Sequence, residues 1–414
     1  MPKKKRIKND DPSDIDGFAG PWAKFEGEKH TSKPSEEDAK IIEAYLAKRK
    51  KRRPQPTAEG GESVQDQNFQ ERAQLHIKDP YDYQGRSFLQ APRTLDGVVL
   101  HSDTRPEGCR IPTKLAHTFT GHTKAITSTI YFPNTAHLIL SSSLDNKVKL
   151  WEMYQERRCI MTYSGHKQGV RNICFNYDGS KFVSASYDKF IKLWDTETGQ
   201  CSQRFTNGKM AYCLKFHPDE ESSHLFLAGM SNNKILCWDC RSGEIVQEYD
   251  RHLGAVNSVT FVDENKKFVS TSDDKSLRVW EWDIPVDVKY IADPTLHSMP
   301  AVTSAPNNKR LICQSMDNKI QAFSCQNKFK LDNKKIFKGH MVAGYACVPD
   351  FSIDMSMVVS GDADGKIFFW SWSTTRIITT IKAHDSACIS VMWHPHERQK
   401  LVSAGWDNLI KIWE

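Results

Sequence analysis

The sequence has no apolar run long enough to span a membrane, and no signal peptide opens it. These absences argue against an integral membrane protein and against a secreted one. Cysteine is present, with 11 residues scattered along the chain. Because nothing directs the chain to an oxidising compartment, we expect these cysteines to be reduced thiols.

Recognisable catalytic motifs are also missing. The sequence contains no glycine-rich phosphate loop and no Gly-x-Ser-x-Gly. Cys237 and Cys240 form one C-x-x-C, without the second pair that would complete a zinc site. The two histidines around Pro395 read as part of a turn rather than as metal ligands. We therefore expect no catalytic, cofactor-binding or metal-binding residues and no small-molecule substrate, and we interpret the chain as a non-enzyme.

What the sequence does contain is a repeat. A stretch at Ser143–Glu152 returns in similar form at Ser186–Asp195 and Ser272–Glu281. Seven aromatic anchors follow one another at intervals of 43, 44, 42, 43, 47 and 43 residues: Trp151, Trp194, Trp238, Trp280, Phe323, Trp370 and Trp413. A period of about 40–45 residues that ends in Trp-Asp or Trp-Glu is typical of four-stranded WD40 blades. The sequence predicts an all-β fold, a seven-bladed WD40 propeller over residues 114–414.

Polar residues recur around these anchors. An Asp stands six residues before each anchor, except for Asn232 in the third unit, and most units have a His further upstream. In a propeller blade the Asp accepts a hydrogen bond from this His, and a Ser on the second strand links the His to the Trp N–H. We predict three complete sets: His122, Ser143, Asp145 and Trp151; His166, Ser186, Asp188 and Trp194; His252, Ser272, Asp274 and Trp280.

The other units depart from this pattern. The third unit lacks the His, and Phe323 of the fifth has no N–H to donate. The sixth and seventh carry Asp362 and Gly405 where the first, second and fourth carry the predicted Ser. We expect weaker or rewired networks in these blades.

The ring also needs an additional strand. The chain stops at Glu414, one residue after the last anchor, so the last blade lacks its outer strand. The stretch Leu115–Thr120 precedes the first blade and is available to supply it. Because an uncovered sheet edge promotes aggregation, we predict that Leu115–Thr120 pairs with Leu409–Trp413 and closes the ring.

Residues 1–56 form a basic tail, with 15 Lys and Arg against 10 Asp and Glu, so +5 of the net charge of +6 lies there. Lys3, Lys4, Lys5 and Arg6 resemble a nuclear-import signal, although a solvated basic terminus would look the same. Residues 35–53 are predicted to form a helix, with Ser35 as its N-cap and Pro54 after its end. The C-terminal end of this helix is basic and consists of Lys48, Arg49, Lys50, Lys51, Arg52 and Arg53. This end either contacts RNA phosphates or is a solvated face.

Aromatic residues mark two further segments before the propeller. Trp22 lies in a short aromatic cluster that contacts either a partner or the chain's own propeller. Residues 57–113 are predicted to be a flexible linker, polar from Thr57 to Arg72, followed by an extended arm. Tyr81 and Tyr83 in this arm are candidate contacts with the propeller or with a neighbour.

An aromatic arc is predicted on one face of the ring. The residue before each turn Asp should be polar, yet Leu144, Tyr187 and Trp406 occupy this position in the first, second and last blades, and Met316 in the fifth. Blades seven, one and two are neighbours in a closed ring, so we predict a contiguous surface for a protein or peptide partner. The alternative is that the arm at Tyr81–Leu89 covers it.

Several stretches resemble one family beyond the general repeat. The segments Gly17–Phe25, Tyr81–Leu89, Trp194–Cys201 and Gly243–Met299 are similar to the pre-mRNA-processing factor 17 family, also called cell division cycle 40 homologs. The resemblance covers nearly all of residues 9–414. It implies a nuclear, non-enzymatic scaffold of the spliceosome that acts chiefly in the second catalytic step, exon ligation. It also implies spliceosomal proteins and small nuclear ribonucleoprotein particles as partners.

A second function class stays open. Trp238-Asp239-Cys240-Arg241 fits the Trp-Asp-x-Arg pattern of substrate receptors on cullin-type ubiquitin ligases. Arg241 would there meet acidic groups of an adaptor. Against this interpretation, the motif lies in the most degenerate blade, and matches of four residues recur by chance among WD-repeat proteins.

Overall fold

The computed structural model describes residues 71–81, 85–92, 100, 106, 108–325 and 329–414. Contacts divide the chain into two units, Met1–Asn68 and Phe69–Glu414, and all described residues belong to the second. Several predicted features therefore lie outside the described residues: the import cluster Lys3–Arg6, Trp22, the helix over 35–53 with Lys48–Arg53, and Tyr83.

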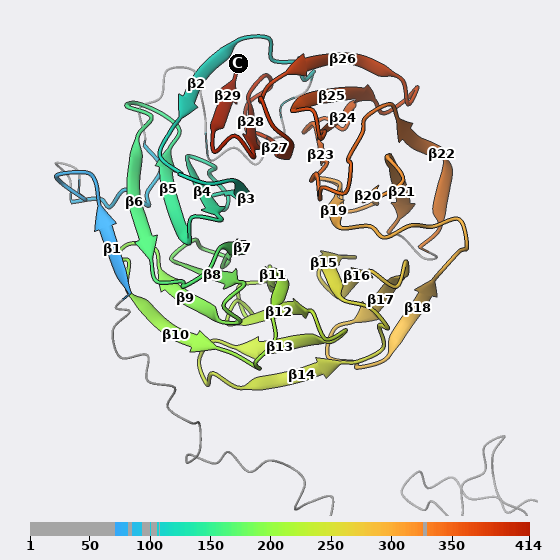
Figure 1. Ribbon diagram of the computed structural model, residues 1–414, viewed down its shortest axis with the longest axis horizontal. Coiled ribbons are helices and arrows are strands. Elements are labelled where there is room, and N and C mark those ends of the chain that lie inside the picture. Colours follow the sequence, from blue (N-terminus) through green and yellow to red (C-terminus); the bar gives the residue numbers. More distant parts are fainter. Residues whose placement is uncertain (1–70, 82–84, 93–99, 101–105, 107, 326–328) are drawn as a thin grey trace, which may run out of the picture. The chain divides into compact units, whose positions relative to one another are not determined.

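Seven antiparallel sheets, one of five strands and six of four, follow one another around a ring (Figure 1), which confirms the predicted propeller. Blade one contains β3 (Ile126–Tyr131), β4 (Leu138–Ser143), β5 (Lys147–Glu152) and β6 (Cys159–Ser164). Blade two contains β7 (Val170–Phe175), β8 (Lys181–Ser186), β9 (Ile191–Asp195) and β10 (Cys201–Phe205). Blade three contains β11 (Ala211–Phe216), β12 (Leu225–Met230), β13 (Ile235–Asp239) and β14 (Ile245–Tyr249).

The second half of the ring continues in the same order. Blade four contains β15 (Val256–Val262), β16 (Lys267–Ser272), β17 (Leu277–Glu281) and β18 (Asp287–Ile291). Blade five contains β19 (Ala301–Ser304), β20 (Arg310–Ser315), β21 (Lys319–Ser324) and β22 (Leu331–Lys338). Blade six contains β23 (Asp350–Phe351), β24 (Met357–Gly361), β25 (Lys366–Ser371) and β26 (Ile377–Lys382). The part of the chain that is described includes no helix, and so none that is long and apolar enough to cross a membrane.

Blade seven is built from both ends of the propeller. Its strands are β27 (Cys388–Trp393), β28 (Leu401–Gly405), β29 (Ile410–Trp413) and, outermost, β2 (Leu115–Phe119). Leu115 lies opposite Trp413 and Phe119 opposite Ile410. The Lys114 N–H also donates to the Glu414 carbonyl over 2.8 Å. The predicted closure is therefore confirmed.

The burial pattern of each strand follows its position within the blade. The second strand of blade one, β4, is buried at all six positions, because neighbouring blades cover both of its faces. The outer strand β26 has only exposed and half-buried residues, because no blade covers its outer side at the rim. Apolar clusters join neighbouring blades: Leu150 and Tyr163 of blade one pack in one cluster with Phe182 and Trp194 of blade two. The core is thus a ring of layers between sheets.

Four blades contain a closed chain of hydrogen bonds, which we call a relay. In blade one, His122 Nδ1 lies 2.9 Å from Asp145 Oδ2 and His122 Nε2 lies 2.8 Å from Ser141 Oγ. The Trp151 indole N–H donates to the same Ser141 oxygen over 2.7 Å. The same contacts recur at 2.7–2.9 Å in blades two, four and seven: His166, Asp188, Ser184 and Trp194; His252, Asp274, Ser270 and Trp280; His384, Asp407, Ser403 and Trp413.

The serines predicted for three relays were the wrong ones. Ser143 accepts the Asp145 N–H over 3.1 Å and donates to the Lys124 carbonyl, so it fastens the turn instead of reaching the tryptophan. The backbone N–H groups of Asp188 and Asp274 likewise donate to Ser186 and Ser272. The register explains the difference, because Trp151 stands opposite Ile139 and its indole extends two residue pairs along the strands, to the position of Ser141. The relay serine lies ten residues before the tryptophan.

The same offset corrects the prediction for blade seven. Gly405 occupies the turn position, and Ser403 completes a full relay. The expectation of a weakened network in this blade was therefore wrong.

Blades three, five and six lack the relay, as expected. In blade three, the Trp238 indole nitrogen and the Asn232 oxygen are buried without a hydrogen-bond partner among the described residues. In blade five, His297 is exposed to solvent. In blade six, the Trp370 N–H donates to the Lys338 carbonyl over 3.0 Å, and His340 Nε2 instead contacts Gln314 Oε1 of blade five at 2.8 Å.

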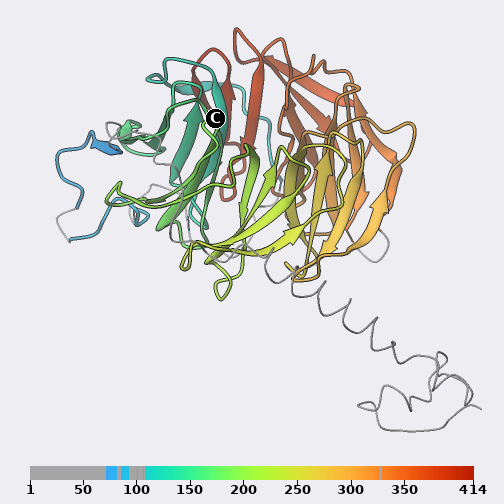
Figure 2. The same ribbon diagram turned by 60° about the horizontal axis from the view of Figure 1, so that its bottom comes forward.

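The arm before the propeller adds a fifth strand to blade one. Strand β1 (Arg72–Leu75) pairs antiparallel with β6, with Arg72 opposite Ser164, and lies at the rim in Figures 1 and 2. The half-buried Glu71 carboxylate accepts from Lys192 Nζ over 2.7 Å and also contacts Arg204, both on blade two. The predicted flexible stretch therefore ends before Glu71, because the open edge of β6 offers backbone partners to the chain.

The arm then crosses the ring closure. Leu100 is buried in one cluster with Trp151 of blade one and Ile410 of blade seven. The Cys109 N–H donates to Asp354 of blade six over 2.9 Å, and the Arg110 N–H donates to the Arg398 carbonyl of blade seven over 3.0 Å. The described arm thus contacts blades two, one, seven and six on its way into β2.

Candidate interface at the mouth of the central channel

The loops that carry the relay histidines and the turns that carry the relay aspartates lie on one face, because they bond to each other. We call this the upper face. Antiparallel strands then place the hairpins between the first and second strands on the opposite, lower face. A cavity of about 760 Å³ runs along the first strands of the blades. Its lining includes the three residues of the predicted arc, Leu144, Tyr187 and Trp406, and also Met316 of blade five.

These four side chains differ in exposure. Trp406 is 39% exposed and Met316 is 36% exposed. Leu144 and Tyr187 are half-buried, which corrects the expectation that the whole arc would be exposed. Leu144 packs on Gly169 of the neighbouring blade, where an added Cβ would lie 2.8 Å from Leu144 Cδ2. The arc is therefore the wall of a concave mouth, a shape that suits an inserted side chain or peptide.

Sequence reasoning missed other apolar residues on this face. The Tyr345 ring lies edge-on to Trp406, with ring centroids 4.7 Å apart. Leu253 and Met341, which follow the relay or loop histidines, are 81% and 57% exposed. The sequence feature that could have identified Leu253 and Met341 is an apolar residue directly after a His, in a loop where a polar residue is expected.

Burial and hydrogen bonding act in opposite directions on the carboxylates of the mouth. Burial alone would raise the pKa of Asp188, but the hydrogen bond and charge of His166, with two backbone N–H groups, hold this pKa below its usual range. Asp350, in the channel wall, accepts the N–H groups of Phe351 and Trp393 over 2.8 Å each, yet burial raises its pKa to about 7. The relay aspartates therefore stay ionised and locked into the scaffold.

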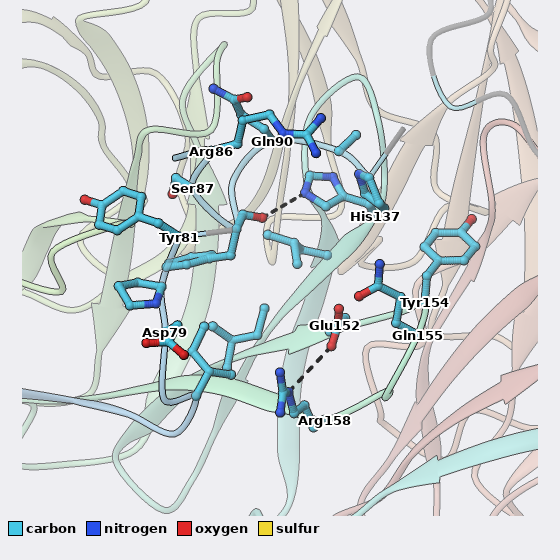
Figure 3. Close-up of a pocket in the computed structure, with 17 residues that line it drawn as sticks. Asp79, Tyr81, Arg86, Ser87, Gln90, His137, Glu152, Tyr154, Gln155 and Arg158 are labelled. Carbon is cyan, nitrogen blue, oxygen red and sulfur yellow. Dashed lines mark hydrogen bonds and ion pairs between the residues drawn. The ribbon is translucent and has the colours of Figure 1, made fainter. Parts of the chain in front are cut away.

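The described part of the arm does not cover this mouth. Tyr81 forms an antiparallel bridge with Ser87, and the Phe88 carbonyl lies 3.2 Å from His137 Nε2 on the lower face. Figure 3 shows this contact in a cavity of about 610 Å³ between the arm and blade one. Tyr81 itself is 54% exposed there. The alternative that Tyr81–Leu89 buries the arc is therefore wrong for its described residues.

The remaining candidate residues lie elsewhere. The Arg241 side chain is 68% exposed, and its Nε lies 3.8 Å from Asp239 Oδ1. All eleven cysteines are free thiols, and burial raises the pKa of both Cys237 and Cys240 to about 12. Over the described ranges, no three His, Cys, Asp or Glu side chains are grouped so that they could hold a metal ion.

Comparison with known families agrees with the ring. The WD domain, G-beta repeat model matches residues 113–152, 157–195, 243–281, 332–371 and 375–414. These ranges correspond to blades one, two, four, six and seven, and they leave out blades three and five, which lack both the relay serine and the relay histidine.

The chain is also similar to individual proteins over its whole length. It is 58% identical over 412 residues to human pre-mRNA-processing factor 17, an alignment that covers 100% of this chain and 70% of the human protein. It is 34% identical over 395 residues to pre-mRNA-processing factor 17 of Saccharomyces cerevisiae, covering 94% of this chain and 84% of the yeast protein. Mouse WD repeat-containing protein 25 is 25% identical over 332 residues. With the propeller, its closure and this level of identity together, the chain belongs to the pre-mRNA-processing factor 17 family.

Proposed function

We propose that this protein is a non-enzymatic scaffold of the spliceosome that acts in pre-mRNA splicing, chiefly in the second catalytic step. The observation that carries the proposal is the 58% identity along the whole chain to proteins named pre-mRNA-processing factor 17. The concave mouth with Trp406 at its edge supports a binding role, because exposed aromatic side chains beside a pocket anchor protein partners.

The way in which the chain binds its own arm supports the same role. The rim of blade one accepts β1 as an added strand, and the lower face of the same blade holds Phe88. A propeller that binds extended segments at rim, mouth and lower face can hold several spliceosomal proteins and small nuclear ribonucleoprotein particles at once. The partners that we propose for the mouth contact Leu144, Tyr187 and Trp406, while Trp22 provides contacts from the tail and Tyr81 and Tyr83 provide contacts from the arm.

The basic tail completes the proposal. Lys3, Lys4, Lys5 and Arg6 direct the protein to the nucleus. The cluster from Lys48 to Arg53 contacts RNA phosphates. Both assignments rest on the sequence of the tail.

The decisive experiment is purification of the tagged full chain from nuclear extract, with identification of the proteins and RNAs that accompany it. Spliceosomal small nuclear RNAs together with lariat intermediate support a second-step role. Cullin adaptors in place of those RNAs would overturn the proposal, and Arg241→Ala would then show whether the Trp-Asp-x-Arg motif holds the adaptor.

The mouth is tested by Trp406→Ala combined with Tyr187→Ala. We expect recovery of protein partners to fall while the melting temperature changes little, because the Trp406 side chain is partly exposed. Tyr177→Ala combined with Val246→Ala removes exposed apolar side chains away from the mouth and is the matched control. Equal partner recovery with both double variants would contradict a binding role for the mouth.

A further inference from the structure

The upper face carries opposite charge on its two halves. The upper loops of blades one to three contain six lysines and two aspartates, a net of +4 with histidine neutral. Those of blades four to seven contain four cations and nine aspartates, a net of −5. The loops counted are 120–125, 144–147, 165–169, 187–190, 206–210 and 231–234 for the first half, and 250–255, 273–276, 292–300, 316–319, 339–349, 362–366, 383–387 and 406–409 for the second.

The two aspartates of the positive half do not neutralise its surface. Asp145 and Asp188 belong to relays, and their side chains are only 4% and 6% exposed. Lysines on the same loops are exposed instead, and four of them form no ion pair with any described carboxylate: Lys124, Lys147, Lys189 and Lys209. The relays therefore withdraw the negative charge from the surface and leave the positive charge on it.

Hydrogen bonds between neighbouring blades join these loops into one surface. The Asn146 amide donates to the Lys167 carbonyl over 3.0 Å, which fastens the turn of blade one to the loop of blade two. The Thr206 hydroxyl donates to the Lys189 carbonyl over 2.8 Å, which fastens the turn of blade two to the loop of blade three. The resulting row of exposed lysines, which we call the lysine crescent, contains Lys124, Lys147, Lys167, Lys189 and Lys209.

Aromatic side chains accompany the crescent. Phe190, next to Lys189, is 39% exposed. Tyr187 lines the channel mouth beside it, and the Tyr212 ring lies 5.8 Å from the Arg171 guanidinium carbon on the wall of the same channel. A row of cations next to accessible aromatic rings is the combination that binds single-stranded nucleic acid, because phosphates follow the cations while bases stack on the rings.

We propose that the lysine crescent binds single-stranded RNA, with its phosphates along the lysines and its bases toward Phe190 and the channel mouth. Lysine acts as a point charge on a flexible stem and tolerates a moving row of phosphates, whereas fixed carboxylates of an acidic peptide are held by arginine forks, which the crescent lacks. The anionic half repels the strand, so the bound stretch ends at blade four. This surface is separate from the cluster Lys48–Arg53 and does not depend on a second-step role.

The test compares two variants of the full chain that lose the same charge. One carries Lys124→Ala, Lys147→Ala, Lys189→Ala and Lys209→Ala. The control replaces four exposed cations of the lower face: Lys181→Ala, Lys309→Ala, Lys330→Ala and Arg398→Ala. Binding of a labelled oligouridylate of about 12 nucleotides is followed by fluorescence anisotropy between about 50 and about 200 mM salt.

We expect the upper-face variant to bind at least ~10-fold more weakly at the lower salt concentration, and the slope of log K against log salt to fall by about 2 to 3, since each phosphate contact contributes about 0.7. The control variant should bind within about 2-fold of the unmodified chain. Equal weakening of both variants, or of neither, would overturn the proposal, as would a polyglutamate peptide that competes as well as unlabelled RNA.

A second measurement uses the unmodified chain, so it does not depend on how the variants fold. Oligouridylate crosslinked by ultraviolet light should attach to peptides that contain Tyr187 or Phe190. Crosslinks found only within residues 1–56 would place all RNA binding in the tail and overturn the proposal.

Discussion

Blades with a closed relay and blades without one differ in how they satisfy buried polar atoms. In blade two, the Trp194 N–H, the Ser184 hydroxyl, His166 and Asp188 satisfy one another. In blades three, five and six, seven buried side-chain atoms have no partner among the described residues: Asn232 Oδ1, Trp238 Nε1, Tyr249 Oη, Ser315 Oγ, Asp317 Oδ1, Gln321 Oε1 and His340 Nδ1. The four relay blades contain two such atoms, Gln203 Oε1 and Arg278 Nε. An unpaired buried polar group costs about 1–3 kcal/mol, so stability should be distributed unevenly around the ring.

The distribution follows the position of the ring closure. Blades seven, one and two are contiguous, all have relays, and all are contacted by the arm or by β2. A ring closed by non-covalent pairing is most exposed to opening where its ends meet. Three of the four relay blades therefore lie where opening would begin, and most of the unpartnered buried atoms lie on the far side of the ring.

Removal of β2 should have the largest effect on this arrangement. Deletion of residues 114–120 leaves β29 with an open edge and opens the ring at its best-satisfied blades. We expect loss of the cooperative thermal transition and aggregation, followed by circular dichroism and light scattering. Deletion of residues 1–68, which belong to the other unit, is the control and should leave the transition of the propeller intact. A soluble, cooperative melt of the 114–120 deletion would contradict the role of β2.

An aspartate inside a relay should matter far more than its counterpart outside one. Asp188→Ala leaves His166 and the backbone N–H groups of Lys167 and Phe190 without their acceptor. We expect a loss of about 3 kcal/mol in the free energy of unfolding. Asp364→Ala is the matched change in blade six, where the side chain is 61% exposed, and should stay within about 0.5 kcal/mol. Urea denaturation of both variants checks the difference, and similar losses would show that the relay adds nothing.

Acid should reveal that His340 of blade six lacks the aspartate contact of the relay histidines. Burial without a carboxylate partner lowers the pKa of His340 to about 4. Since this folded pKa lies below the unfolded value of 6.5, the unfolded state binds more protons between the two values, so stability is full above about pH 6.5 and falls toward pH 4. We expect His340→Gln to reduce the stability lost between about pH 7 and pH 5 by about 2 kcal/mol.

The control for this pH effect is Ser360→Ala in the same blade. It removes a buried polar side chain but no titratable group, so it should leave the pH dependence of the urea midpoint unchanged. An equal pH dependence in the His340→Gln variant and the unmodified chain would contradict the assignment to His340.

The sequence was sufficient for the ring and insufficient for its details. The spacing of the tryptophans predicted seven blades, and the position of Glu414 relative to Trp413 predicted the closing strand. The relay serine could not be identified with certainty, because Ser141 and Ser143 both lie on β4 two residues apart and point to the same face. Only the register with β5 shows which one meets the indole.

Blade six and the arm show what sequence patterns leave open. Blade six has His340, Ser360, Asp364 and Trp370, yet its His lies one or two residues further from its Asp than in the relay blades and contacts Gln314 instead. Strand β1 has four residues with little apolar pattern, and its place is set by the free edge of β6 and by the pairing of Glu71 with Lys192. Both outcomes depend on contacts between blades, which periodicity within one blade does not encode.

The smallest predicted effect would convert part of a blade without a relay into one with it. Ala228 is buried and stands opposite Leu236, with Trp238 opposite Phe226, so it occupies the register position of Ser141 in blade one. Ala228→Ser adds one hydroxyl that can accept the unpaired Trp238 N–H. We expect a gain of about 1 kcal/mol in the free energy of unfolding, since a hydrogen bond contributes about 0.5–1.5 kcal/mol and the added volume is small.

Ala185→Ser, at a buried position of blade two where Trp194 already has its acceptor, is the control and should be neutral or destabilising. If Ala228→Ser is no more stable than this control in urea denaturation, the unpaired indole N–H of Trp238 does not limit the stability of blade three. The difference in stability between blades with and without a relay would then depend on the His–Asp pair rather than on the serine.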